Sequence, residues 1–213
     1  MFDEPLHAME KCVDDNLAYI SIFEDDILLG ENAEQFLAND EWLKVRFNFQ
    51  EIFVLRLETF LMPVQLEHQQ QILPFQERNI DILKSKHFGT AGYIISNGAA
   101  KYLINLFEKL AVEEVKAIDE IMFNEQINVG LYQVYQLNPA ICVQELQLNQ
   151  ENSLLVSDLQ QERKKNTAVH TKKTLKHRLT RIKENIIRAL NKEKWKEQQR
   201  LKEMQGKEIV RFM

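Results

Sequence analysis

The chain has 213 residues, 45% of them hydrophobic, which is enough apolar side chain for a folded core and excludes a wholly disordered protein. Its two cysteines, Cys12 and Cys142, exclude a disulfide-rich scaffold and a zinc ribbon, and are typical of reduced thiols in a cytosolic protein. No apolar run reaches the ~18 residues of a membrane span, and we expect no signal peptide, because the first residues lack its basic and apolar parts.

The net charge of -5 conceals an uneven distribution of charge along the chain. Residues 1–160 hold 10 Lys and Arg against 26 Asp and Glu, whereas residues 161–213 hold 17 against 6. A division of this kind indicates two parts with different partners. We therefore predict an acidic domain over residues 1–160 and a basic helical tail over residues 161–213.

Hydrophobic spacing predicts the elements of the first half of the chain. A short helix over residues 5–16 precedes a continuous apolar run at 17–23, which favours a buried strand. Residues 31–50 are partly helical in pattern, and residues 52–57 predict a second buried strand. Residues 58–80 show little pattern and are expected to form a loop.

The second half continues the alternation. A glycine-containing loop leads into a strand at residues 93–95, and a helix with one apolar face begins at Asn97. Residues 117–126 predict another helix or a loop that enters one, and residues 131–137 predict a half-buried strand. Strands alternating with helices, and strands that are apolar throughout, predict an α/β domain with a mainly parallel sheet.

The predicted tail contains a basic amphipathic helix over residues 174–190. Lysines and arginines surround an apolar stripe whose members recur three and four residues apart, namely Leu175, Leu179, Ile182, Ile186 and Leu190. Such a helix either lies on an anionic membrane surface or packs its stripe against the domain. Nucleic-acid binding is disfavoured, because no aromatic residues alternate with the basic ones.

Three carboxylates, Glu24, Asp25 and Asp26, directly follow the first predicted strand. Adjacent carboxylates repel one another, and burying any of them unpaired is costly. In open α/β sheets ligands bind beyond the carboxyl ends of strands, and carboxylates there suit a hard divalent cation that also contacts phosphate oxygens. The alternative is a solvated loop at the end of the strand.

Four stretches, in order along the chain, resemble glycosyltransferase family 25, the bacterial lipooligosaccharide and lipopolysaccharide sugar transferases that are related to collagen galactosyltransferases. These stretches are YISIFEDDILLGENAEQFL at 19–37, FGTAGYIISNGAAKYLI at 88–104, AIDEIMF at 117–123 and YQLNPAICVQE at 135–145. The resemblance covers roughly residues 5–160. It implies an A-type, Rossmann-like glycosyltransferase fold, a UDP-sugar donor, and Mn²⁺ or Mg²⁺ as cofactor.

The resemblance also implies roles for the three acidic residues. Asp26 is the expected metal ligand and Glu24 lies on the same side, because side chains alternate along an extended chain. Asp25 would then orient the donor or a neighbouring residue. A cation held there would neutralise charge on the departing diphosphate.

An inverting transfer needs a general base near the acceptor hydroxyl, and the resemblance points to Asp119, with Glu120 beside it. The alternative for Asp119 is a helix cap, since it precedes an apolar stretch. The glycine-containing loop and strand are expected to approach the donor or acceptor, or simply to form a turn; their residues are Gly89, Thr90, Gly92 and Tyr93. His68, His87 and His170 are expected to be ordinary surface histidines; the alternative is a third metal ligand from the later part of the chain.

The resemblance begins part-way along the family's sequence pattern, so the family's first strand and a Ser-His segment have no counterpart in this chain. We therefore expect an N-terminally incomplete sheet with an unpaired edge and an incomplete uridine pocket. The leading hypothesis is a metal-dependent, inverting enzyme that moves a hexose, foremost galactose, from a UDP-sugar onto a lipid-linked oligosaccharide of lipooligosaccharide or lipopolysaccharide. It would work in the cytoplasm at the inner face of the bacterial inner membrane.

Two other interpretations stay open. One is a truncated, non-catalytic remnant that serves only as an α/β interaction module. The other is a nucleotide-binding module of a different class, although no phosphate-cradling glycine loop of the usual spacing supports it.

Overall fold

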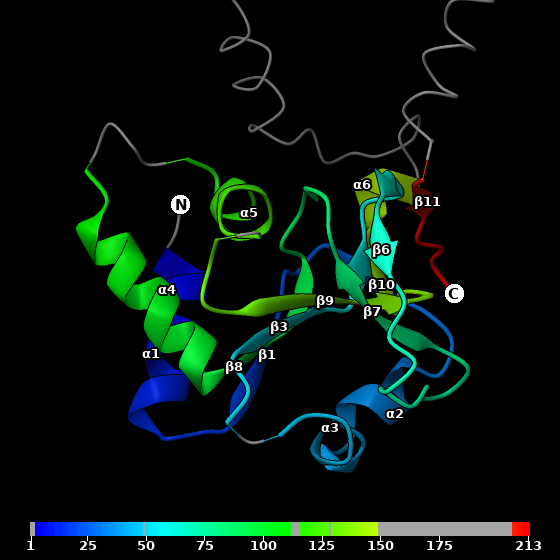
Figure 1. The fold of residues 1–213 in the computed structure, drawn as a ribbon, viewed down its shortest axis with the longest axis horizontal. Helices are drawn as coiled ribbons and strands as arrows, with labels where there is room; N and C mark the ends of the chain where they lie inside the picture. The colour runs from blue at the N-terminus through cyan, green and yellow to red at the C-terminus, as the bar shows by residue number, and fades with distance from the viewer. Residues whose placement is uncertain (1–2, 49, 112–115, 128, 149–205) are drawn as a thin grey trace, which may run out of the picture. The chain divides into compact units, whose positions relative to one another are not determined.

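The computed structural model describes residues 3–48, 50–111, 116–127, 129–148 and 206–213 (Figure 1). The helices are α1 (Asp3–Asp14), α2 (Ala33–Leu37), α3 (Glu41–Lys44), α4 (Asn97–Lys109), α5 (Ile118–Glu120), which continues as a π-helical turn (Ile121–Glu125), and α6 (Glu145–Leu148). The strands are β1 (Tyr19–Phe23), β2 (Ile27–Leu29), β3 (Phe53–Arg56), β4 (Glu58–Thr59), β5 (Pro63–Val64), β6 (Leu66–Glu67), β7 (Asn79–Leu83), β8 (Gly92–Ser96), β9 (Gln133–Asn138), β10 (Cys142–Gln144) and β11 (Glu208–Ile209).

The main sheet has six strands in the order β1-β8-β3-β9-β7-β6. Within this described sheet only the pair β3 and β9 is parallel, and the other four pairs are antiparallel. The α/β class is confirmed, whereas the prediction of a mainly parallel sheet is wrong.

The continuous apolar character of the strands results from burial on both faces of the sheet and does not indicate strand direction. Val54 and Ile95 point into the core on the side of α1 and α4. Leu55 and Ile94, their neighbours along the same strands, point into the core that contains Trp42 of α3. A central strand covered on both faces is apolar at every position whichever way its partners run.

The α1 and α4 helices lie side by side on one face of the sheet (Figure 1). Both were predicted from their spacing, and the buried residues Met9 and Leu103 lie on their inner faces. Ser96 begins α4, because its Oγ accepts the backbone N–H of Ala99 at 3.4 Å. The helix therefore starts directly where β8 ends.

The C-terminal residues are part of the same folded unit. Strand β11 pairs with β5, Val210 is fully buried, and Thr59 Oγ1 donates a hydrogen bond to the Val210 carbonyl at 2.7 Å. Lys207–Met213 thus belong to the compact unit of the main sheet and not to the tail predicted over residues 161–213. The predicted amphipathic helix over 174–190 lies outside the described residues.

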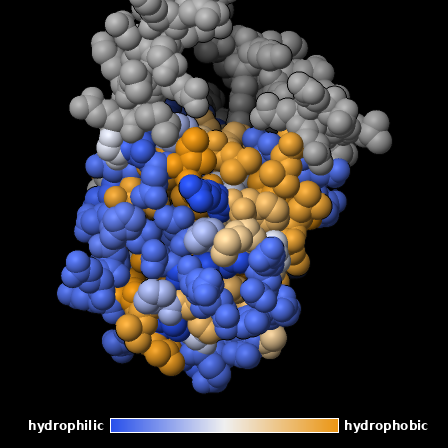
Figure 2. All heavy atoms as spheres, turned by 90° about the vertical axis from the view of Figure 1, so that its right-hand side faces the viewer, coloured by the Kyte–Doolittle hydropathy of each residue, from blue (hydrophilic) through white to orange (hydrophobic). Residues whose placement is uncertain are grey.

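In the part of the chain that the structure describes, no helix has the length and apolar character needed to span a bilayer. Polar and apolar side chains are both exposed on the side that carries β11 and α6, and the apolar ones gather in the upper part of that face (Figure 2). Leu148 of α6, Ile209 of β11 and Met213 at the end of the chain are exposed apolar residues.

Gly92 packs so closely that its replacement should be costly. A Cβ added there would overlap the Sγ of Cys142 and lie 3.1 Å from the ring of Phe23. We expect Gly92→Ala to lower the free energy of unfolding by about 1–3 kcal/mol through overpacking, measured by urea denaturation. In the double variant Gly92→Ala/Cys142→Ala part of this loss should be recovered; strictly additive losses would contradict the overlap.

Candidate functional site

Glu24 and Asp26 lie close together just beyond β1, and Gln144 joins them. The Gln144 Nε2 donates to Glu24 Oε2 at 2.9 Å and to Asp26 Oδ2 at 3.4 Å. Gln144 is placed there because β10 pairs with β2, which sets it opposite Ile27. Among the described residues the other oxygen of Asp26, Oδ1, is buried without a hydrogen-bond partner. Asp25, between them, is exposed.

A turn at residues 88–91 (the 88–91 turn) connects this carboxylate pair with Asp119. The N–H of Gly89 donates to Asp119 Oδ2 at 3.0 Å, and the next residue, Thr90, donates from Oγ1 to Glu24 Oε1 at 3.1 Å. Gly89 has φ +83°, a backbone conformation that favours glycine. The structure thus brings together Glu24, Asp26 and Asp119 through two successive residues of one turn.

Asp119 is buried and lies inside α5. The N-cap of that helix is Ala117, so the alternative interpretation of Asp119 as the cap is wrong in position. Its Oδ1 nonetheless accepts the N–H of Glu120 at 2.9 Å, an N–H that also donates to the carbonyl of Ala117 at 3.0 Å. The side chain of Glu120 is half-buried.

Gly92 and Tyr93, also named from the sequence, belong to strand β8 and are buried. The hydroxyl of Tyr93 is enclosed and makes no hydrogen bond within the described structure. Both residues therefore contribute packing beneath the site, while Gly89 and Thr90 form the turn above them.

Two residues that the sequence analysis missed, Arg56 and Glu58, are fully buried beneath the 88–91 turn. Arg56 Nη2 donates to Glu58 Oε1 at 2.9 Å, and Glu58 Oε1 also accepts the N–H of Ala91 at 2.9 Å. Two charged residues, one inside and one at the end of the otherwise apolar run at 52–58, were a signal that could have identified them.

The cluster is strongly negative. Loss of hydration is the largest cause that raises the pKa of Glu24, the carboxylates of Asp26 and Asp119 raise it further, and hydrogen bonds to its carboxylate oppose the rise. Burial raises the pKa of Glu58 to about 7, although Arg56 opposes this shift. Such a cluster favours a bound cation, because a positive charge relieves the repulsion among the carboxylates.

Over the described part of the chain, no three or more His, Cys, Asp or Glu side chains form a cluster that could hold a metal ion by themselves. Glu24 and Asp26, with the unpartnered Oδ1 of Asp26, nevertheless fit an ion that completes its coordination from elsewhere. Mg²⁺ is commonly bound in this way, by one or two carboxylates together with substrate phosphates and water.

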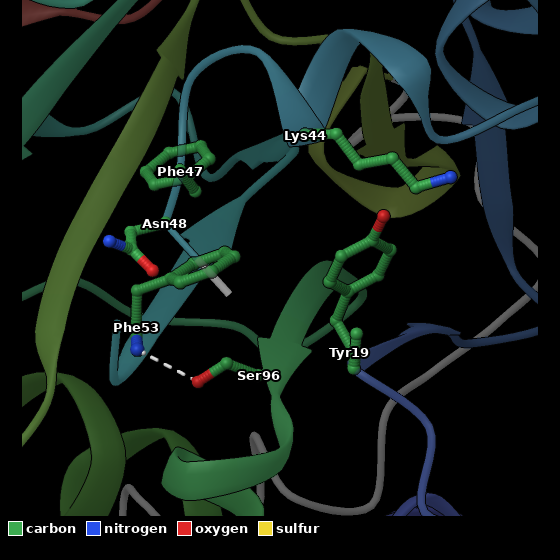
Figure 3. A pocket seen from close by; sticks show the side chains of 7 residues that line it. Tyr19, Lys44, Phe47, Asn48, Phe53 and Ser96 are labelled. Carbon is green, nitrogen blue, oxygen red and sulfur yellow. Dashed lines mark hydrogen bonds between the residues drawn. The ribbon is translucent and has the colours of Figure 1, made fainter. Parts of the chain in front are cut away.

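A cavity of about 210 Å³ lies elsewhere in the fold (Figure 3). Its walls include Tyr19 and Ser96, which face each other across β1 and β8, and the stacked rings of Phe47 and Phe53. Since Glu24 follows the other end of β1, the cavity and the carboxylates lie at opposite ends of this strand pair.

Comparison with known proteins identifies relatives along most of the chain. The family model described as glycosyltransferase family 25 (LPS biosynthesis protein) matches residues 7–122. The lipooligosaccharide biosynthesis protein lex-1 of Haemophilus influenzae is 64% identical over 203 residues, which cover 95% of this chain and 67% of that protein.

The chain belongs to glycosyltransferase family 25. Two further relatives come from Neisseria gonorrhoeae, and both are lacto-N-neotetraose biosynthesis glycosyltransferases. LgtE is 43% identical over 74% of this chain and 58% of its own length, and LgtB is 39% identical over 97% and 75%. The chain thus spans between 58% and 75% of the length of these three family members.

The family 25 match contains Glu24, Asp26, the 88–91 turn and Asp119, while Gln144 lies beyond it. The residues brought together by the fold are therefore those that the resemblance had named, with Gln144, Arg56 and Glu58 added by the structure.

His87, expected at the surface, is instead 1% exposed beside the 88–91 turn. Burial, followed by the positive charge of Arg56, holds its pKa well below the ordinary value of 6.5. Below pH 6.5 the unfolded chain therefore binds a proton at His87 that the folded chain does not bind. The stability due to neutral His87 is present above pH 6.5 and is lost progressively as the pH falls below 6.5.

We expect His87→Gln to remove this pH dependence. From pH 6.5 down to about pH 5, the wild type should lose about 2 kcal/mol more unfolding free energy than the variant, measured by urea denaturation at each pH. The comparison isolates His87, because Glu58 and the other carboxylates are present in both proteins. Parallel curves would show that His87 is not kept neutral by the fold.

Proposed function

We propose that this family 25 chain transfers a hexose, galactose in the first instance, from a UDP-sugar to a lipid-linked oligosaccharide, with inversion at the anomeric carbon and with help from a divalent cation. The observation that carries the proposal is the 88–91 turn, which binds Glu24 through Thr90 and Asp119 through Gly89. It sets carboxylates suited to a cation next to a separate carboxylate suited to accept a proton. The names of the relatives, which concern lipooligosaccharide and lacto-N-neotetraose biosynthesis, support the acceptor class.

In this mechanism each carboxylate has a distinct task. Glu24 and Asp26 would hold Mn²⁺ or Mg²⁺ against the diphosphate of the donor, and the ion would neutralise the charge that grows as UDP departs. Asp119 takes the proton of the acceptor hydroxyl while that oxygen bonds to the anomeric carbon and the bond to the diphosphate breaks. Its hydrogen bonds from Gly89 and Glu120 fix the direction of its oxygens. The proposal includes an A-type arrangement of the sheet around this site.

The proposal extends to the place of the reaction. The acceptor would be presented at the cytoplasmic face of the inner membrane, and the basic segment 174–190, which lies outside the described residues, would bind anionic lipid. Vesicles with and without anionic lipid test this part: the full chain should co-sediment with the anionic ones alone.

The central experiment measures UDP release from UDP-galactose by the purified chain, with Mn²⁺ and with a chelator, alongside the melting temperature in both conditions. We expect UDP release and a raised melting temperature with Mn²⁺ only. UDP-glucose and UDP-N-acetylglucosamine, assayed in parallel, identify the sugar. If UDP is not released and Mn²⁺ does not shift the melting temperature, the proposal is overturned in favour of a non-catalytic interaction module.

A further inference from the structure

The Arg56–Glu58 ion pair is buried in the site, yet the mechanism above gives it no task. The two side chains are 0% and 1% exposed. A buried ion pair is a poor source of stability, because the loss of hydration offsets the attraction between the charges. Its presence is better explained by what it holds in place.

The pair holds the 88–91 turn by its backbone. Arg56 Nη1 donates to the carbonyl of Gly89 at 2.7 Å, and Nη2 donates to the carbonyl of Phe88 at 3.0 Å. Glu58 accepts the N–H of Ala91 at 2.9 Å. Three of the four turn residues are therefore held from below by a single ion pair.

Arg56 also contacts the helical segment that carries Asp119. Its guanidinium lies over the ring of Phe123, 4.2 Å from the ring centre, and Phe123 is four residues beyond Asp119. The carbonyl of Phe123 in turn accepts the N–H of His87 at 3.1 Å, just before the turn. One guanidinium thus touches both structures that determine where Asp119 lies.

Glu58 limits the space available to the turn. Its Oε2 is buried without a hydrogen-bond partner among the described residues, and a Cβ on Gly89 would lie 3.0 Å from that oxygen. Glu58 therefore leaves no room for a side chain at residue 89, the position whose N–H donates to Asp119.

We propose that Arg56 and Glu58 are a positioning pair, which fixes the 88–91 turn from below and so sets the placement of Asp119 relative to Glu24. The inference rests on the proposed function for its effect on catalysis. It predicts a loss in kcat with little change in KM for the donor, because the pair acts through Asp119 and Glu24 and has no contact with substrate of its own. A displacement of about 1 Å in such a site lowers the rate by as much as 10²-fold.

The main test replaces both charges together, as Arg56→Met/Glu58→Leu, so that neither is left buried alone. A matched control removes the exposed ion pair Lys84–Glu67 at the far edge of the same sheet, as Lys84→Met/Glu67→Leu. We expect kcat for UDP-galactose turnover to fall about 10- to 100-fold in the test variant, with KM within about threefold of wild type, and no change in the control.

Two further measurements separate positioning from a general structural role. Hydrogen exchange at the amides of Gly89 and Ala91 should become at least about tenfold faster in the test variant, while amides of α4 stay protected. In the background Asp119→Asn, the double replacement should cause a much smaller further loss of kcat than in the wild type, because one of the two carboxylates through which it acts has already been removed.

These experiments distinguish failure of the positioning pair from failure of the proposed function. An inactive wild type overturns the proposed function, and the exchange rates then still decide whether the pair holds the turn. An active wild type with unchanged kcat and unchanged exchange in the test variant overturns this inference. If the double variant does not fold, Arg56→Lys, which keeps the charge but loses the fork that reaches two carbonyls, is judged by the same readouts.

Discussion

Replacing Asp119 by asparagine is expected to lower kcat by about 10²- to 10⁴-fold, with little effect on KM for the donor. Asparagine keeps the size of the side chain and can still accept one backbone N–H, but it cannot take the proton of the acceptor hydroxyl. The folded structure should persist, since Asp119 lies in a short helix and the asparagine oxygen can still accept the N–H of Gly89 or of Glu120. The measurement is steady-state transfer with saturating donor and acceptor.

Glu120→Gln is the matched control for this variant. Glu120 is the adjacent carboxylate, half-buried, and the sequence analysis named it beside Asp119. Only Asp119 is linked to the 88–91 turn. We therefore expect Glu120→Gln to retain kcat within a small factor, and a large loss there with none in Asp119→Asn would assign the proton transfer to Glu120.

The elements that the sequence predicted correctly are those with a strong local pattern. The helices α1 and α4 have regular apolar spacing, and β1, β3, β8 and β9 are apolar runs or alternations bounded by polar residues. Strand direction could not be predicted in this way, because it depends on which strands pair in the sheet. A run such as Phe53–Arg56, which is buried on both faces, has the same apolar pattern in a parallel and in an antiparallel pair. The two-residue strands β4 and β5 were missed because distant partners, β10 and β11, create them.

The same distinction applies to the site. Glu24, Asp26 and Asp119 could be named because they stand in recognisable segments. Gln144 also stands in such a segment, but its contact with Asp26 could not be predicted, because it spans 118 residues and depends on the pairing of β2 with β10. The charge of Arg56 within an apolar run was a visible signal, but its contacts with the carbonyls of the 88–91 turn became known only from the fold.

Asp26→Asn is expected to abolish the dependence on Mn²⁺ and to lower kcat/KM by about 10²- to 10³-fold, because one of the two carboxylates that would face the ion is lost. The amide can still accept the hydrogen bond from Gln144, so the local structure should hold. Without metal the variant should melt at a higher temperature than the wild type, since the carboxylate that repels Glu24 has gone.

Asp25→Asn provides the comparison, because Asp25 is adjacent and exposed and carries the same charge. It should keep the rise in melting temperature that Mn²⁺ causes in the wild type, whereas Asp26→Asn should show none. Asp26→Asn should therefore raise the stability without metal and lower the activity with metal. A cation site built from carboxylates that repel one another requires both effects. Lower stability without metal, or a retained response to Mn²⁺, would show that Asp26 has a structural role and that the ion, if one binds, is held elsewhere.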